Sequence, residues 1–237
     1  MRAIPRARVL PRLSRWLAVC VLMSGLALAR GASALVLGQS DDFEDDTTQG
    51  WVVNLLGFAS STLPPINVPN NGPAGAGDNF LRLSSNGGFG SSGRLVVINP
   101  AQWAGDYAAA GITAISASLR NLGETDLSVR LYFADATSAD PTNQAISTNP
   151  ILLPSGSGWV DVIFPIAPGD LSALRGTAAA ALSGAAEMRI FHGGTASFPP
   201  DRIVGILGVD DLAAVPEPGA GLLLGLGLAW LAARRRR

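Results

Sequence analysis

The chain has 237 residues, of which 48% are hydrophobic and 15% are charged. This composition is too apolar for a disordered chain, and the length suits one large domain or two small ones. Residues 35–215 hold seven arginines against 17 acidic residues, a net charge of −10, and the chain has no lysine. Because a nucleic-acid-binding protein needs a basic face to neutralise phosphates, we expect no nucleic acid among the partners.

The N-terminus has the pattern of a secretory signal peptide. Several arginines precede an apolar run over residues 16–29, which as a helix would be roughly 21 Å long, shorter than the ~30 Å hydrocarbon core of a bilayer. Ala32 and Ala34 then form an A-x-A sequence of small side chains, which is typical of a cleavage site. We predict a signal peptide over residues 1–34, cleaved after Ala34; the alternative is an uncleaved anchor helix.

The only cysteine, Cys20, lies inside this apolar run. It has no small residue before it and no polar sequence after it, so a lipid-modified cysteine is not favoured. Once the signal peptide is removed, the mature chain has no thiol. Disulfides, thiolate metal sites and cysteine nucleophiles are therefore excluded.

Short apolar segments separated by Gly, Pro, Asn and Ser follow, and they predict strands. The alternation is clearest over residues 127–134. Leu127, Val129, Leu131 and Phe133 would share a buried face, and the residues between them would lie on a solvent-exposed face. One crossover helix is predicted over residues 171–182, with Asp170 as its N-cap. Strands are predicted over residues 35–43, 50–54, 79–85, 94–99, 112–121, 127–134, 159–166, 187–192 and 203–212.

These elements predict an all-β domain over residues 35–214. Several strands of five to ten residues without a βαβ rhythm favour an antiparallel β-sandwich, most simply a jelly roll, with one short crossover helix. A signal helix would precede this domain and a hydrophobic helix would follow it. Two long loops, residues 57–78 and 135–150, are expected to flank a binding surface.

The opening of this domain carries a dense acidic cluster, Asp41, Asp42, Glu44, Asp45 and Asp46, ahead of Gln49-Gly-Trp51. Together with the sequence GAGDNFLRL over residues 75–83, it resembles the opening of galactose-binding-like jelly rolls, which occur in many carbohydrate-binding proteins. The resemblance covers residues 43–212 loosely. Asp46 departs from it, because such sequences commonly have glycine there.

Carboxylates at this density repel one another unless they are solvated or hold a cation, and Ca²⁺ suits oxygen ligands in an exported protein. The resemblance implies a structural calcium that ties the first strand to the last, and Glu44, Asp78 and Asp210 would match its ligands. The alternative is a solvated turn in which Asp42 or Asp45 caps backbone amides. A structural calcium is the only cofactor that the sequence suggests, and none is required by it.

Trp103, Asp106 and Tyr107 lie close together in the sequence and predict a saccharide-binding platform, since sugar rings stack on exposed aromatic faces. Core packing is the alternative for Trp103, and it is the expectation for Trp51 and Trp159.

No catalytic residue is predicted. His192 is the only histidine, and no Gly-x-Ser-x-Gly sequence supplies a serine for a catalytic triad, so His192 is expected to be a turn residue. Two-carboxylate glycosidase chemistry stays open, because the sequence does not give the separation of the carboxylates.

The C-terminus has three parts: Val215-Pro216-Glu217-Pro218, an apolar run over residues 219–233, and Arg234-Arg235-Arg236-Arg237. The prolines keep Glu217 extended, the apolar run is about 22 Å long as a helix, and the arginines favour the cytoplasmic side. This pattern, over residues 215–237, resembles the PEP-CTERM sorting signal of Gram-negative bacteria. The alternative is an ordinary single-span tail.

This resemblance implies recognition by an exosortase in the inner membrane, with Glu217 as a recognition residue, and removal of the tail near Pro-Glu-Pro. We therefore expect a non-catalytic protein that crosses the inner membrane and reaches the cell surface or the extracellular matrix, with a transient or retained C-terminal anchor. Its expected partners are the exosortase, the export machinery, the inner membrane and exopolysaccharide. A secreted polysaccharide hydrolase and a purely structural surface protein are the alternatives.

Overall fold

The computed structural model describes residues 35–53 and 62–216. The predicted signal peptide, with Ala32 and Ala34, and the sorting signal from Glu217 to Arg237 lie outside the described residues, as do the two predicted terminal helices. Within the described ranges no helix has the length and hydrophobicity that a membrane span requires.

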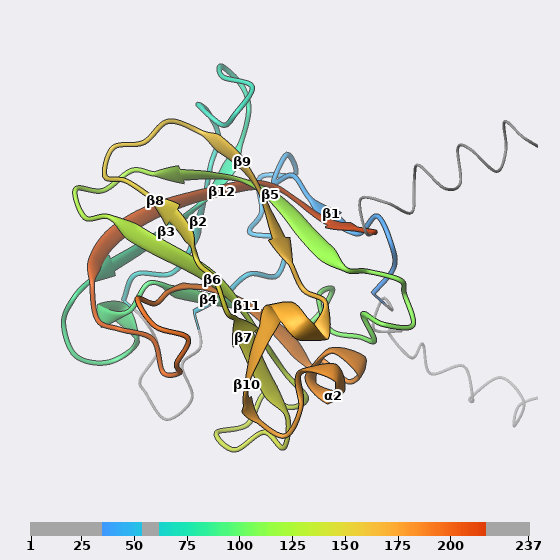
Figure 1. The fold of residues 1–237 in the computed structure, drawn as a ribbon. Coiled ribbons are helices and arrows are strands. Elements are labelled where there is room, and N and C mark those ends of the chain that lie inside the picture. Colours follow the sequence, from blue (N-terminus) through green and yellow to red (C-terminus); the bar gives the residue numbers. More distant parts are fainter. Residues whose placement is uncertain (1–34, 54–61, 217–237) are drawn as a thin grey trace, which may run out of the picture. The chain divides into compact units, whose positions relative to one another are not determined.

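Two antiparallel sheets pack face to face (Figure 1). We call them sheet A and sheet B. The strands of sheet A, in spatial order, are β2 (Ile66–Val68), β3 (Phe80–Asn86), β12 (Val204–Val215), β5 (Ala114–Asn121) and β9 (Val160–Pro165), with β1 (Ser40–Asp41) beside β12. Those of sheet B are β10 (Leu171–Arg175), β7 (Gln144–Ser147), β6 (Leu127–Ala134), β11 (Glu187–His192) and β4 (Val96–Asn99), with β8 (Ile151–Leu153) beside β6. This arrangement confirms the predicted antiparallel β-sandwich.

The core lies between the inner faces of the two sheets. On β6 the four alternating residues Leu127, Val129, Leu131 and Phe133 are all buried there. Leu119 of β5 and the inward residues of β12 belong to the same buried cluster. The period of two in the sequence therefore fixed which side of these strands faces inward.

The outer face of sheet B is not wet, contrary to the expectation for β6. Arg130 and Tyr132 have exposed fractions of only 4% and 2%. The segment after β11 covers them: Gly193 and Gly194 offer carbonyl oxygens to Arg130, and the ring of Phe198 stacks on Tyr132. The outer face of the sheet thus becomes the floor of a groove, and the segment after β11 becomes one of its walls.

The helix predicted over residues 171–182 is wrong in its first half. Residues 168–170 form the 3-10 helix η2 (Pro168–Asp170), and β10 then pairs with β7. Gly176 interrupts the chain with a φ of 56°. The helix α2 (Ala178–Ser183) begins only after it, capped by the Thr177 hydroxyl, which accepts a hydrogen bond of 3.1 Å from the Ala180 amide. The alanine run is helical, as predicted, but the cap is Thr177 and not Asp170.

Several short strands were not predicted. β2 lies inside the predicted loop 57–78, β7 inside the predicted loop 135–150, and β8 just beyond it. Conversely, the predicted strand 50–54 contributes only an isolated bridge between Val52 and Ile98. A further 3-10 turn, η1 (Ser91–Gly93), precedes β4.

Candidate functional site

A groove of about 450 Å³ lies on the outer face of sheet B, and we call it the sheet B groove. Strands β6, β7, β10 and β11 form its floor. One wall is the loop between β6 and β7, and the other is the segment that follows β11. The residues that line the groove are Tyr132, Ser138, Ala139, Pro141, Gln144, Leu174, Arg175, Arg189, Ser197, Phe198 and Pro199.

Aromatic rings form one side of the groove. The ring of Phe198 stacks on that of Tyr132, with centroids 4.7 Å apart and an angle of 27° between the planes. Phe191 meets Phe198 edge-on at 6.3 Å. Tyr132 and Phe191 are buried, whereas Phe198 is only partly buried. The position of the Phe198 ring is therefore fixed by the rings beneath it, and part of the ring stays accessible.

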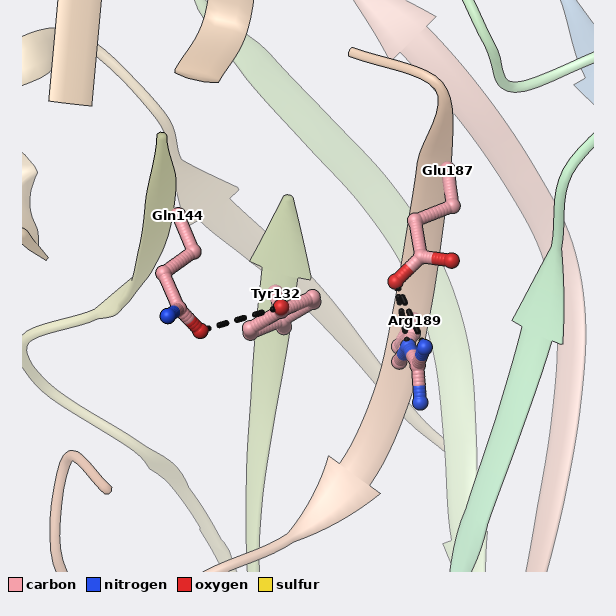
Figure 2. A network of polar contacts seen from close by, with 4 residues as sticks. All are labelled: Tyr132, Gln144, Glu187 and Arg189. Carbon is pink, nitrogen blue, oxygen red and sulfur yellow. Dashed lines mark hydrogen bonds and ion pairs between the residues drawn. The ribbon is translucent and has the colours of Figure 1, made fainter. Parts of the chain in front are cut away.

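A buried ion pair between Glu187 and Arg189 lies on the strand beside Tyr132 (Figure 2). Arg189 donates from Nε to Oε1 of Glu187 at 2.7 Å, and its Nη2 lies 2.7 Å from the same oxygen. The guanidinium carbon lies 5.3 Å from the Tyr132 ring centroid and 4.9 Å from that of Phe198. These contacts hold the cation of Arg189 against the aromatic wall.

Glu187 holds Arg189 in this position through the ion pair. Burial raises its pKa, and the hydrogen bond and charge of Arg189 oppose that shift. Its second oxygen, Oε2, is buried with no hydrogen-bond partner. Glu187 does not line the groove, so its role in this arrangement is to position Arg189.

Polar groups occupy the other side of the floor. The Tyr132 hydroxyl donates to Oε1 of Gln144 at 3.1 Å, as Figure 2 shows. Burial raises the pKa of Tyr132 to about 12, so this hydroxyl keeps its proton and stays a donor. Because the Gln144 oxygen is occupied, its amide NH₂ group is the part of this side chain that a ligand would meet.

The loop wall is tied to the sheet at two places. At its base, Asp135 Oδ2 accepts from the backbone amide and the Nδ2 group of Asn143, at 3.0 and 2.7 Å. At its tip, Asp140 pairs with Arg175 of β10 at 2.7 Å, but these side chains are 78% and 50% exposed. An exposed pair of this kind contributes little to stability, so Arg175 can exchange Asp140 for a ligand at small cost.

The structure does not form the predicted saccharide platform. Trp103 and Tyr107 are both 0% exposed. Trp103 donates from Nε1 to Oδ2 of the buried Asp41, and the Tyr107 hydroxyl donates to the Trp103 carbonyl oxygen at 2.8 Å. Burial raises the pKa of Tyr107 well above its usual value. Asp106 is exposed and accepts from the Ala109 amide in a local turn, so neither ring offers a face to a sugar.

Trp159 also departs from the expectation that it belongs to the core. It lies on the outer face of sheet A, partly exposed, and its ring meets Phe80 edge-on at 5.2 Å. Trp51, in contrast, is fully buried, as expected.

Four acids of the cluster lie in a solvated turn of the kind that the alternative described, whereas Asp41 is buried. Asp42 and Asp45 accept hydrogen bonds from the amides of residues 44 and 47, at 3.3 and 3.0 Å. Asp46 has a φ of 60°, a left-handed conformation that glycine prefers and aspartate tolerates. This explains why an aspartate stands where similar sequences commonly have glycine.

The residues predicted to bind calcium lie in one neighbourhood. Asp210 is buried on β12, and its pKa is raised to about 7 by burial and by the charges of Asp211, Asp78 and Glu44. Glu44 Oε1 accepts from the Asn79 amide at 2.8 Å. Within residues 35–53 and 62–216, however, no group of three or more His, Cys, Asp or Glu side chains is placed to hold a metal ion. Calcium binding by Glu44, Asp78 and Asp210 stays a prediction.

His192 has a structural role. Its Nδ1 accepts a hydrogen bond of 3.0 Å from the Ser128 amide, and burial lowers its pKa. It therefore joins the ends of β6 and β11 as a neutral ring. The lining of the sheet B groove contains no Asp or Glu, and so it lacks the carboxylate pair of a glycosidase.

The sequence indicated only part of the groove. Tyr132 was placed on the outer face of β6, and the loop 135–150 was expected beside a binding surface. The contribution of Phe198 was missed, because no local pattern ties residue 198 to residue 132. The spacing of Glu187 and Arg189 could have predicted their ion pair, since residues two apart on a strand point to the same side of the sheet.

Comparisons with known proteins show similarity of two kinds. Among solved structures, an exo-β-agarase has a TM-score of 0.51 at 11% identity, over 76% of this chain and 25% of that one. The family 11 carbohydrate-binding module from Clostridium thermocellum, in complex with a β-1,3-1,4-mixed-linked tetrasaccharide, has a TM-score of 0.47 at 13% identity, over 77% and 98%. The module CBM27-1 from Caldicellulosiruptor saccharolyticus, in complex with mannohexaose, has a TM-score of 0.40 at 11% identity, over 77% and 98%.

This chain thus spans only a quarter of the agarase chain, and at such identities the likeness concerns the fold, a galactose-binding-like jelly roll. A comparison with curated protein sequences finds no match. Residues 214–237 match the model of the PEP-CTERM protein-sorting motif, which indicates an exported protein with a C-terminal sorting signal.

Proposed function

We propose that this chain is a non-catalytic, saccharide-binding protein that an exosortase processes and that resides at the cell surface or in the extracellular matrix. The observation that carries the proposal is the sheet B groove, in which a partly exposed aromatic ring and several polar side chains line one cavity. The likeness to the exo-β-agarase shows the fold alone, so the ligand class comes from the chemistry of the groove.

A sugar ring has an apolar face of C–H groups and a polar edge of hydroxyl groups. Phe198, held by Tyr132, offers an apolar surface for the face. The Gln144 amide and the half-exposed guanidinium group of Arg175 line the same groove and offer donors for the hydroxyl edge, while the buried Arg189 lies against the Phe198 ring. An aromatic surface with a few convergent polar groups is the usual composition of a small-ligand site.

Binding is favoured over hydrolysis for a specific reason. The lining of the groove has no carboxylate, and Glu187, the acid closest to it along β11, is committed to Arg189. A glycosidase needs a carboxylic acid and a carboxylate on either side of the bond it cleaves. The arginine and glutamine side chains that line the groove can donate hydrogen bonds to a ligand, but they do not transfer a proton at neutral pH.

Exosortase processing is consistent with where the sandwich ends. Strand β12 ends at Val215, within the matched motif and just before Pro216. Removal of the tail near Pro-Glu-Pro would thus leave every strand of both sheets intact. Mass spectrometry of the protein from the cell surface should find a C-terminus near Pro218, and a chain that still ends at Arg237 would contradict this part.

A glycan array tests the binding proposal. The full chain, purified in mild detergent, should bind a subset of polysaccharide fragments without releasing reducing ends. Phe198→Ala and Arg175→Ala should each weaken that binding. The matched controls are Phe89→Ala and Arg202→Ala, because Phe89 is 89% exposed, contacts Arg202 and, like Arg202, lies outside the groove lining. The proposal would be contradicted if the control variants lost as much binding as Phe198→Ala and Arg175→Ala, or if the protein released reducing ends.

A further inference from the structure

A second cavity, of about 490 Å³, lies on the outer face of sheet A, on the side of the sandwich opposite to the sheet B groove. We call it the sheet A cleft. Two arginines, Arg82 and Arg120, line it together with two asparagines and four apolar side chains. The described part of the chain is acidic overall, so two cations in one cavity are a distinct local feature.

The register of sheet A places these arginines in a row. Gly208 of β12 lies directly between Arg82 of β3 and Arg120 of β5 in the strand pairing. Directly opposed residues of a sheet share a face, so both side chains rise from the outer face, with Cα atoms about 10 Å apart across two strand spacings. The residue between them has no side chain, which leaves room for aromatic rings to pack over it, and both arginines line the cavity beside those rings.

The Trp159 ring packs over this glycine. A Cβ on residue 208 would lie 2.9 Å from the Trp159 ring and 3.4 Å from that of Phe80, so glycine is what lets Trp159 lie against the sheet. The Trp159 indole donates to the Asn71 carbonyl oxygen at 3.0 Å. This bond fixes the Asn70–Asn71 wall of the sheet A cleft next to Phe80, which supplies its aromatic part.

No acid in the described ranges forms an ion pair with either arginine. Among the described residues, neither Arg82 nor Arg120 has a hydrogen bond or an ion pair from its side chain, and Nε of Arg120 is buried without a partner. Arg175 and Arg189, by contrast, pair with acids, and Arg130 donates to four carbonyl oxygens. A buried donor without a partner is unfavourable until a ligand accepts from it.

We infer that the sheet A cleft binds an anionic saccharide, one that carries carboxylate or sulfate groups. Guanidinium groups suit both anions because two parallel N–H donors match two acceptor oxygens. The saccharide nature of the ligand rests on the proposed function, whereas its charge follows from the two unpaired arginines.

The surroundings favour sparse negative charge over dense charge. Further along β5, the Ser118 hydroxyl donates to Asp161 at 2.8 Å and to Asp211 at 3.3 Å, so carboxylates follow the arginines on the same face. A nucleic acid, with a phosphate at every nucleotide, would meet these acids unfavourably. A polysaccharide with neutral sugars between its anionic ones can place its charges on the arginines alone.

The test is calorimetric titration of the full chain, in mild detergent, with oligogalacturonate, a sulfated carrageenan fragment and a neutral agaro-oligosaccharide. Arg82→Gln with Arg120→Gln should weaken binding of the anionic ligand by at least about tenfold. Arg94→Gln with Arg202→Gln, which removes the same charge outside the sheet A cleft, should leave it unchanged. Arg82→Gln alone covers the case in which the double variant fails to fold, since Arg82 is exposed.

Binding of either anionic ligand that depends on Arg82 and Arg120 supports the inference, and the preferred ligand identifies the anion. Equal losses in the two double variants, or no binding of either anionic ligand, would overturn it. If the neutral saccharide binds through Phe198 while neither anionic ligand binds, the sheet B groove is supported and the sheet A cleft is overturned, so the two proposals are separable.

Discussion

Trp103 donates a hydrogen bond of 2.6 Å from its indole Nε1 to Oδ2 of Asp41 inside the sandwich. Trp51 donates to the same oxygen at 2.7 Å, and Gln102 donates to Oδ1. Burial raises the pKa of Asp41, and these three donors oppose the shift. One buried carboxylate at β1 thus joins two tryptophans that are far apart in the sequence.

This relationship predicts a structural role for Trp103. Trp103→Phe keeps an aromatic ring but leaves Asp41 with one donor fewer, so the free energy of unfolding should fall by about 1–3 kcal/mol. Trp159→Phe, whose indole bond is partly exposed, should cost less. Urea denaturation measures both, and a Trp103→Phe variant with full stability but weaker saccharide binding would contradict the buried role.

The Glu187–Arg189 pair predicts strong coupling. Arg189→Met alone leaves a buried carboxylate without its partner, and we expect a loss of about 3–5 kcal/mol in the free energy of unfolding. Glu187→Met with Arg189→Met removes both charges and should be clearly more stable than the single variant. A double-mutant cycle in urea measures the coupling, and additive losses would show that the pair does not interact as described.

Asp210 predicts a pH dependence. Its pKa of about 7 in the folded protein lies above the ordinary value of 3.8, so the folded state keeps a proton that the unfolded chain releases. The contribution to stability is therefore present below about pH 4 and is lost as the pH rises through about 7, a loss of about 1–4 kcal/mol. Asp41 and Glu187, whose pKa values are also raised, shift stability in the same direction. The test is therefore to measure the free energy of unfolding of the wild type and of Asp210→Asn between pH 4 and 8. The stability of the variant should depend less on pH than that of the wild type. If the two stability curves are parallel, Asp210 is not the cause.

Calcium gives a related prediction. A cation held by Glu44, Asp78 and Asp210 would offset their repulsion, so Ca²⁺ at pH 7.5 should raise the melting temperature, and the increase should be smaller in Asp210→Asn. Differential scanning fluorimetry with Ca²⁺ and with EDTA provides the measurement, and Mg²⁺ is the control ion. An unchanged melting temperature would end the calcium prediction and leave this region as an acidic turn.

The fold was largely predictable from the alternation of apolar residues, and the errors have identifiable causes. β6 and β11 have their predicted bounds, because each has six or more residues with a clear inner face. β2 and β8 have three residues each, too few to show a period of two. The alanine-rich run 171–182 looked helical throughout, but pairing with β7 and the positive φ of Gly176 divide it into a strand and a helix.

The candidate site was harder to predict than the fold. Trp103 and Tyr107 are close in sequence, and that closeness suggested a platform, but whether an aromatic ring faces inward depends on contacts with distant residues such as Asp41. The sheet B groove depends on Phe198 reaching Tyr132, and the sheet A cleft depends on the register of three strands. Long-range pairing of this kind leaves no trace in a single sequence.

The most direct measurement of the central claim is chemical-shift mapping by NMR of the full chain in mild detergent, titrated with the neutral saccharide that the glycan array selects. The account predicts that the largest changes fall on the Gln144 side-chain amide, on the backbone amides of Ser197 and Phe198, and on the Arg175 Nε–H group. Changes centred on any other surface would contradict the assignment of the sheet B groove, as would a failure of every saccharide to bind.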